Sequence, residues 1–269
     1  MKENITIVAL SDIHGIPRKT EVPQCDVVTI SGDFSPLYIQ RETGLGNSMC
    51  KWITEKFIPW LMSLPCERVV FIGGNHDFVT EESWFVQWFN GELDKTDGAR
   101  EKIHYLQFSQ YEYKGWVFYG CPLADIAGWA WVADGYEQYK PDTGTDIALY
   151  HQAPEYMYVG ASHFWDGSVI NYGSRSMMTA LYDDGVELPK LLLCGHIHTG
   201  DHLPQLISKE GQRCVLCNVS TKDEEYNEYF FPRCFELSMQ DDGTVSVDTW
   251  VDNGSKSQKN EALHEVLVV

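Results

Sequence analysis

The sequence predicts an α/β protein with a parallel β-sheet, and three short apolar runs carry that prediction. The runs are Ile5–Leu10, 27–30 and 69–72. Each one stops at a polar or glycine-rich segment, as expected for a buried strand that ends in a loop. Stretches long enough for helices follow the second and third runs, at 47–64 and 81–89, and the first is expected to end or kink near Pro59. Strands that alternate with helices favour a parallel sheet buried on both faces.

From about residue 103 onward the pattern becomes that of antiparallel strands. Aromatic segments at 105–106, 111–113 and 116–119, with Lys114-Gly115 as a turn, are typical of hairpins. Further strands are expected at 148–150, Leu191–Cys194, 215–219, 231–237 and Val245–Val251. The chain has no internal repeat and no linker rich in Pro or Ser. It therefore predicts one domain with two sheets over residues 1–252, followed by a C-terminal tail, 253–269, that is an edge helix or frayed.

The overall charge limits the classes of partner. Lys and Arg number 20 against 39 Asp and Glu, which gives a net charge of −19. Such a surface repels polyanions, so no nucleic-acid polymer is expected as a partner. A small phosphate substrate stays compatible, because bound divalent cations reverse the local field. No apolar run of about 18 residues occurs, so no membrane span is expected, and eight scattered cysteines predict reduced thiols and a cytoplasmic location.

Five strand ends each place Asp, His or Asn in a loop. The segments are Asp12-Ile13-His14, Gly32-Asp33, Gly74-Asn75-His76-Asp77, His151 and Gly195-His196-Ile197-His198. Because ligands of open α/β sheets gather outside the carboxyl ends of the strands, these segments are expected to converge. Imidazole, carboxylate and amide oxygen without thiolate suit manganese, iron, zinc or nickel. Any one of these motifs alone is more often a loop cap or turn, whereas all five in this order predict a metal centre.

The ordered set resembles the calcineurin-like metallophosphoesterase superfamily, whose blocks read D-x-H, G-D, G-N-H-D/E, H and G-H-x-H. The resemblance runs from Ile5 to about Val219 and implies a four-layer αββα sandwich, with two mixed β-sheets flanked by helices. It also implies two divalent metal ions. The ligands it implies are Asp12, His14 and His198 for the first ion, Asn75, His151 and His196 for the second, and Asp33 as the bridge.

The chemistry that the resemblance implies is hydrolysis of a phosphate ester. Two cations about 3.5–4 Å apart share a water, lower its pKa towards neutrality and neutralise phosphate oxygens. Asp33 and His76 are the predicted catalytic residues, the first by pairing the ions and the second as proton donor to the leaving group. The partner that orients His76 is not identified, and Asp77 is expected to cap the helix that follows.

Two departures from the protein serine/threonine phosphatases of this superfamily bear on the substrate. The segment after Gly32-Asp33 lacks the Asp that orients the catalytic His and an Arg that grips phosphate, and Gly73 replaces another Arg. Without these arginines the site suits a monoanionic diester better than a dianionic monoester. Residues 149–154 are similar to the H-x-P-P loop of small phosphodiesterase-like members. The prediction is a phosphodiesterase for a small organic or nucleotide-like substrate, with a phosphomonoesterase or a non-catalytic scaffold as alternatives; the net charge disfavours a nuclease.

An insertion at 160–176 mixes polar and aromatic residues. Arg175 is a candidate contact for the substrate phosphate, together with Asn75. The favoured interpretation of the insertion is structural, with Ser174 capping a solvated helix that begins at Arg175. Aromatic residues of the insertion and of a nearby segment are expected to pack in the core rather than line a pocket: Trp129, Trp131, Trp165 and Tyr172.

Overall fold

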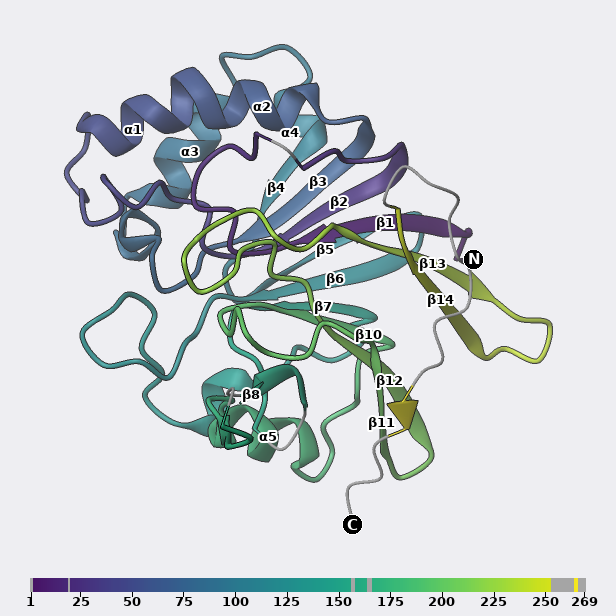
Figure 1. Ribbon diagram of the computed structural model, residues 1–269. Coiled ribbons are helices and arrows are strands. Elements are labelled where there is room, and N and C mark those ends of the chain that lie inside the picture. The colour runs from purple at the N-terminus through teal and green to yellow at the C-terminus, as the bar shows by residue number, and fades with distance from the viewer. Residues whose placement is uncertain (1, 19, 156–157, 164–165, 253–263, 266–269) are drawn as a thin grey trace.

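The structure, a computed structural model, describes residues 2–18, 20–155, 158–163, 166–252 and 264–265. Two large β-sheets pack face to face, and helices cover their outer faces (Figure 1). Both sheets mix parallel and antiparallel pairs, so the predicted four-layer α/β sandwich is confirmed. In the described part of the chain, no helix is long and apolar enough to cross a bilayer.

The first sheet has six strands in the order β14-β13-β1-β2-β3-β4. Their bounds are β1 Ile5–Leu10, β2 Cys25–Ser31, β3 Cys66–Ile72, β4 Ile103–Tyr105, β13 Arg233–Met239 and β14 Val245–Val251. The four strands β1 to β4 are parallel, and β13 and β14 are antiparallel additions at one edge. The prediction that 105–106 begins a hairpin is wrong, because β4 pairs in parallel with β3.

The second sheet has seven strands in the order β15-β11-β12-β10-β7-β6-β5. Their bounds are β5 Ser109–Tyr113, β6 Trp116–Cys121, β7 Ile147–Tyr150, β10 Leu191–Cys194, β11 Gln205–Lys209, β12 Gln212–Asn218 and β15 His264–Glu265. The predicted hairpin at Lys114-Gly115 is confirmed between β5 and β6, with both turn residues at positive φ. Of the predicted tail, only His264–Glu265 is described, and it pairs with β11 as strand β15. The other tail residues lie outside the described part of the chain, so the prediction of an edge helix or a frayed tail stays a prediction.

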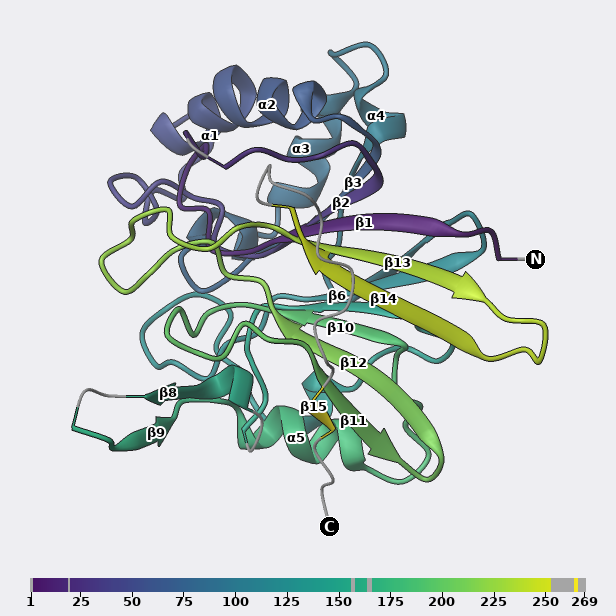
Figure 2. The same cartoon turned by 45° about the vertical axis from the view of Figure 1, so that its right-hand side comes forward.

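The helices of the first half lie over the outer face of the first sheet, and α5 lies over that of the second (Figure 2). The α-helices are α1 Ser48–Trp52, α2 Ile58–Ser63, α3 Phe85–Leu93, α4 Ala99–Lys102 and α5 Arg175–Tyr182. A π-helical turn, Ile53–Phe57, joins α1 to α2, so the chain stays helical through Pro59. The wider turn accommodates the missing N–H of proline, which is why the predicted end at Pro59 does not occur. The helix predicted at 81–89 is a 3₁₀ turn, Phe78–Glu81, followed by α3.

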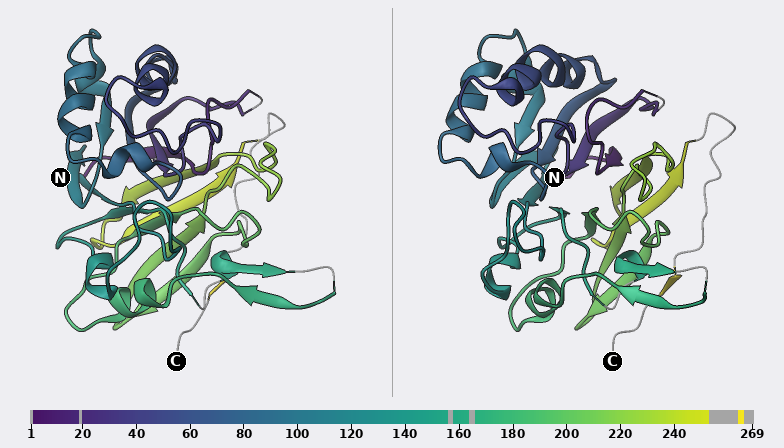
Figure 3. Two further views of the ribbon diagram at one scale, coloured as in Figure 1. Left: turned by 90° about the vertical axis from the view of Figure 1, so that its left-hand side faces the viewer. Right: turned by 60° about the vertical axis from the view of Figure 1, so that its left-hand side comes forward.

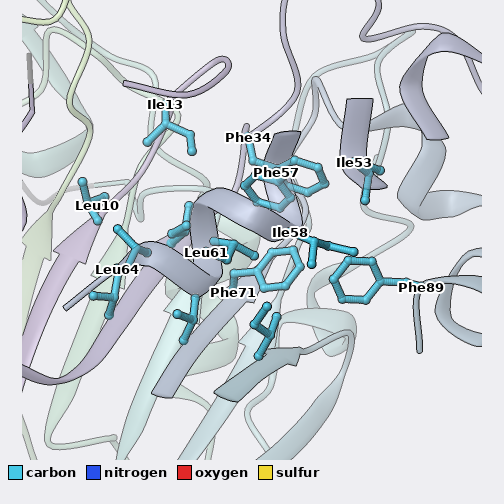
Figure 4. Close-up of a cluster of buried hydrophobic side chains, with 14 of the residues drawn as sticks. Leu10, Ile13, Phe34, Ile53, Phe57, Ile58, Leu61, Leu64, Phe71 and Phe89 are labelled. Carbon is cyan, nitrogen blue, oxygen red and sulfur yellow. The ribbon is translucent and has the colours of Figure 1, made fainter. Parts of the chain in front are cut away.

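Alternating side chains of the central strands fill three apolar layers. In β1, Ile5, Ile7 and Ala9 face the second sheet, whereas Val8 and Leu10 face the helices. Figure 4 shows the outer layer of the first sheet, where Phe34, Phe57 and Phe71 pack beneath α2. Because both faces of the central strands are buried, their polar ends are confined to the loops at one edge.

A separate two-stranded hairpin extends from the body beside α5. It consists of β8, Ala161–His163, and β9, Val169–Asn171 (Figure 3). Its exposed residues include Val169 and Ile170. This hairpin is the described part of the insertion at 160–176, and it places Tyr172 beside the candidate site.

Candidate metal centre

All five predicted segments meet at the carboxyl ends of the parallel strands. Asp12 and His14 follow β1, Asp33 follows β2 and Asn75 follows β3, all in the first sheet. The histidines come from the second sheet, with His151 after β7 and His196 and His198 after β10. The seven side chains therefore reach one place from two sheets, as the strand-end pattern predicts.

One group of donor atoms is formed by Asp12, His14 and His198. Their ligand atoms all lie within 4.8 Å of one another, and His198 Nε2 is 3.3 Å from Asp12 Oδ1. The other ring nitrogen of His198 donates to the Asp223 carbonyl at 2.9 Å, and Ser220 Oγ donates to Asp12 Oδ2 at 2.6 Å. These outer contacts fix the orientation of the donors.

Asp33 lies between this group and the remaining donors. Its Oδ1 is 3.4 Å from His151 Nε2, and its Oδ2 is 3.8 Å from His14 Nε2. Asn75 Oδ1 is 2.8 Å from His151 Nε2, and the His196 ring is 5.1 Å from the His151 ring. A carboxylate in this position faces histidines from both donor groups, which is what a bridging ligand requires.

The donor set fits a metal because of a buried group that protein atoms leave unpaired. Both ring nitrogens of His14 are buried, and neither has a hydrogen-bond partner. Burying such nitrogens without a partner costs about 1–3 kcal/mol each, and coordination of a ligand by one of them would offset part of that cost. Carboxylate, imidazole and amide donors together suit divalent transition metals.

The protonation states also favour metal binding. Burial lowers the pKa of His14 to about 4 and that of His196 to about 3, so both rings are neutral at pH 7. Burial alone would raise the pKa of Asp33, but the positive field of His151 and His76 holds it well below its usual range. Burial opposes protonation of His151 as well, yet the Asp33 charge raises its pKa to about 9. A cation at this point would replace that proton, since metal ligands bind deprotonated.

Four of the seven donor residues have a left-handed backbone. The φ angles are 53° at Asp12, 43° at His14, 53° at Asp33 and 67° at His196. This conformation costs a non-glycine residue on the order of 1 kcal/mol, and such outliers gather at functional sites. The turn that each makes at its strand end aims the side chain into the site instead of along the strand.

His76 lies over the donors with its ring almost buried. It is 8% exposed, and its Nε2 is 3.9 Å from Asp33 Oδ2. Gln40 Oε1 accepts a hydrogen bond from its Nδ1, and the Trp129 ring is 4.3 Å from its ring. Burial lowers the pKa of His76. The ring therefore turns Nε2 towards the metal donors and Nδ1 away from them.

A cavity of about 440 Å³ opens over His76 and the metal donors. Aromatic and polar side chains form its walls, among them Trp129, Tyr172, Tyr226, Ser162 and Glu224. The expectation that Trp129 and Tyr172 pack in the core is wrong, since both line the cavity, whereas Trp131 is buried and donates to Thr80 Oγ1. Trp165 lies outside the described residues.

The sequence of this chain is similar to those of known proteins. The calcineurin-like phosphoesterase family matches residues 5–200 of the chain, a span that contains every one of the donor residues. The chain belongs to the calcineurin-like phosphoesterase family. Metallophosphoesterase domain-containing protein 1 of Homo sapiens and that of Mus musculus are each 24% identical over 213 residues. The match covers 72% of this chain and 60% of each relative, so the chain spans less than two thirds of their length.

Among solved structures, the zinc complex of wild-type Vps29 from Entamoeba histolytica aligns with 95% of this calcineurin-like phosphoesterase and 97% of that chain. The sequence identity is 11% and the TM-score is 0.38. A likeness at that level does not bear on function.

Arg175 does not line the cavity of this calcineurin-like phosphoesterase. Its guanidinium pairs with both carboxylate oxygens of Glu155, at 2.7 and 3.1 Å, and its side chain is largely exposed. Ser174 caps α5 by accepting from the Met177 N–H, as the structural interpretation of the insertion predicts. The geometry thus favours a helix start at Arg175 over a contact to substrate.

Three residues that surround the donor groups were missed or misread from the sequence. Asp77 does not cap the 3₁₀ turn with its side chain; its carboxylate accepts from the N–H groups of Gly74, Phe34 and Ser35 and so ties two donor loops together. Burial, together with the charge of Asp33, raises the pKa of Asp77 to about 7. Gln40 and Tyr226 were not considered at all, because their segments carry no motif. Tyr226, at φ 61°, packs its ring 4.8 Å from that of His14.

Proposed function

We propose that the protein is a metal-dependent phosphodiesterase acting on a diester of a small organic or nucleotide-like alcohol. The observation that carries this proposal is the convergence of six oxygen and nitrogen donor residues on Asp33, with His76 beside them. Membership of the calcineurin-like phosphoesterase family supports it. Two divalent cations, of manganese, iron, zinc or nickel, would activate water and neutralise phosphate oxygens there.

The protein's own residues supply the other parts of the reaction. Asn75 lines the cavity and is placed to contact the phosphoryl group. The histidines would hold the cations, and Asp33 lies between the two donor groups. His76 Nε2 faces the same space. In the doubly protonated imidazolium form of the ring, Nδ1 donates to Gln40 and Nε2 is placed to give its proton to the leaving oxygen.

The charge of the cavity wall favours a diester. In the described part of the chain no lysine or arginine lines the cavity, and Glu224 contributes a negative charge at the wall. A phosphomonoester dianion would need cationic clamps that a diester monoanion does not. The rings of Trp129, Tyr172 and Tyr226 offer apolar surface to the organic groups of the ester.

A matrix of metals and substrates tests the proposal. Metal-stripped protein is reloaded with Mn, Fe, Zn, Ni or Mg and given bis(4-nitrophenyl) phosphate and 4-nitrophenyl phosphate, then nucleotides and cyclic nucleotides. We expect the diester to be hydrolysed faster than the monoester with at least one of the first four metals. Hydrolysis of monoesters only would overturn the diester preference. Absence of hydrolysis with every metal would favour a non-catalytic binding protein.

His76→Ala should retain metal and lose turnover. General acid catalysis contributes about 10²–10⁴-fold, so we expect kcat to fall by that range while metal content stays at the wild-type level. Steady-state kinetics and elemental analysis measure the two quantities. His104→Ala is the matched control, because His104 stacks on Tyr111 away from the site and should leave kcat unchanged. An undiminished rate in His76→Ala would refute its role as proton donor.

A further inference from the structure

The turn between β2 and α1 carries two consecutive residues that are linked to His76, Gln40 directly and Arg41 through the Trp129 ring. Ile39 anchors this turn in the core at 7% exposure. The backbone closes it through Ile39 N–H to the Pro36 carbonyl at 3.1 Å and Glu42 N–H to the Ile39 carbonyl at 3.0 Å. Gln40 and its neighbour therefore have fixed positions although they belong to a loop.

Gln40 contacts the ring nitrogen of His76 that faces away from the metal donors. Its Oε1 pairs with Nδ1, which then carries the hydrogen. The partner is a neutral amide, so it orients the ring without adding a third negative charge beside Asp12 and Asp33. In a site already this acidic, a carboxylate at the same place would repel both aspartates.

Arg41 holds the other side of His76 through a stack of rings. Its guanidinium carbon is 4.5 Å from the Phe78 ring centroid and 4.6 Å from that of Trp129. Trp129 in turn lies 4.3 Å from the His76 ring. Within the described residues, Arg41 forms no ion pair, so its closest interactions are these two aromatic faces. A guanidinium over an aromatic face is attracted by the ring quadrupole, so these contacts hold the two rings in place.

We propose that Gln40 and Arg41 are positioning residues for His76 in the phosphoester hydrolysis proposed above, on which this inference rests. Gln40 sets the tautomer and rotation of the ring, and Arg41 keeps Trp129 pressed against it. Because Gln40 takes the Nδ1 hydrogen, the second proton of the imidazolium lies on Nε2, and the two residues together keep that proton directed at the leaving oxygen. They take the place of the acidic residue that the sequence lacks after Gly32-Asp33.

The leaving-group dependence of the reaction distinguishes positioning from a general structural role. A weakly basic leaving group such as 4-nitrophenolate departs with little need for a proton, whereas unsubstituted phenolate needs one. For Gln40→Ala we expect kcat on methyl phenyl phosphate to fall about 10–100-fold, and on methyl 4-nitrophenyl phosphate less than about 3-fold. Arg41→Leu should show the same pattern with a smaller effect. The ratio of the two rates, compared with wild type and His76→Ala, is the measured quantity.

A second measurement does not depend on activity. In metal-free protein with the His76 ring neutral, long-range ¹H–¹⁵N correlation spectra report which ring nitrogen carries hydrogen. We expect Nδ1 to be protonated in wild type and in Gln40→Glu, and the tautomers to be mixed in Gln40→Ala. Gln87→Ala, on the exposed face of α3, is the matched control for expression and thermal stability.

The outcomes separate the inference from the proposed function. If wild type hydrolyses both esters but Gln40→Ala keeps the wild-type rate ratio and the wild-type tautomer, the positioning role is wrong and the proposed function stands. If wild type hydrolyses neither ester, the proposed function fails and with it the contribution of Gln40 to the reaction. The spectra still decide whether Gln40 fixes the tautomer of the His76 ring. If Gln40→Ala does not fold, the rate ratio and the tautomer of Gln40→Glu and Arg41→Leu are compared with those of wild type instead.

Discussion

Asp33→Asn is expected to lower kcat/KM by about three orders of magnitude or more. The carboxylate faces His14 at 3.8 Å and His151 at 3.4 Å, so it is the one negative charge between the two donor groups. Asparagine has nearly the same shape and can still accept the His76 N–H bond, which Asp33 Oδ1 now accepts at 2.8 Å. The fold is therefore expected to persist while the pair of cations is lost.

Elemental analysis and kinetics of metal-loaded protein measure this effect. We expect Asp33→Asn to bind fewer metal ions per chain than wild type, with an unchanged circular dichroism spectrum. Asp241→Asn is the matched control, since Asp241 is exposed in the turn between β13 and β14. An Asp33→Asn protein that holds two ions and turns over normally would show that Asp33 does not bridge the site.

Gly195→Ala should destabilise the protein through a clash inside the metal centre. A Cβ at this position would lie 2.0 Å from Ser11 Oγ and 2.3 Å from Asp12 Oδ2, both of which are buried. Neither atom can retreat freely, because Ser11 Oγ donates to the Ser31 carbonyl at 2.8 Å and Asp12 Oδ2 accepts from Ser220 Oγ. Overpacking of this kind costs about 1–3 kcal/mol, and displacement of Asp12 should also weaken metal binding.

The same substitution at Gly91 should increase the free energy of unfolding instead of lowering it. Gly91 lies within α3, and a Cβ there would meet no atom within 4 Å. Alanine in a helix is favoured over glycine by about 0.5–1 kcal/mol, so Gly91→Ala should be slightly more stable than wild type. Urea unfolding of both variants gives the comparison. Equal stability of Gly195→Ala and wild type, with full metal content, would contradict the steric argument.

The sequence predicted the donor side chains because each follows a buried strand of a recognisable kind. The apolar runs before Asp12, Asp33 and Asn75 are β1, β2 and β3, and the parallel order of these strands brings their ends together. Pairing of β4 with β3 was not predicted, because a three-residue strand has too little pattern to distinguish a parallel partner from a hairpin. Strand β11 was missed although Glu210-Gly211 offers a turn signal before β12.

The rest of the site depends on the paths of loops, which carry no periodic pattern. Gln40 is 36 residues from His76 in sequence, and it reaches His76 from a turn that is fixed by the buried Ile39 and by backbone hydrogen bonds. Trp129 and Trp131 are two residues apart, yet Trp129 lines the cavity whereas Trp131 is buried in the core. Composition alone cannot separate them, because the difference comes from the direction in which an irregular segment turns. The path of the loop that carries Tyr226 was likewise beyond a sequence-based prediction.

The division of the donor residues between the two sheets links metal binding to the relative position of the sheets. Asp12, His14, Asp33 and Asn75 belong to one sheet, and the three histidines His151, His196 and His198 to the other. Cations coordinated by residues of both sheets would cross-link the two sheets at one end of the sandwich, where the apolar core ends and the charged side chains begin. A displacement of one sheet relative to the other would separate the metal ligands. The rigidity of the sandwich and the metal occupancy of the centre are therefore expected to depend on each other.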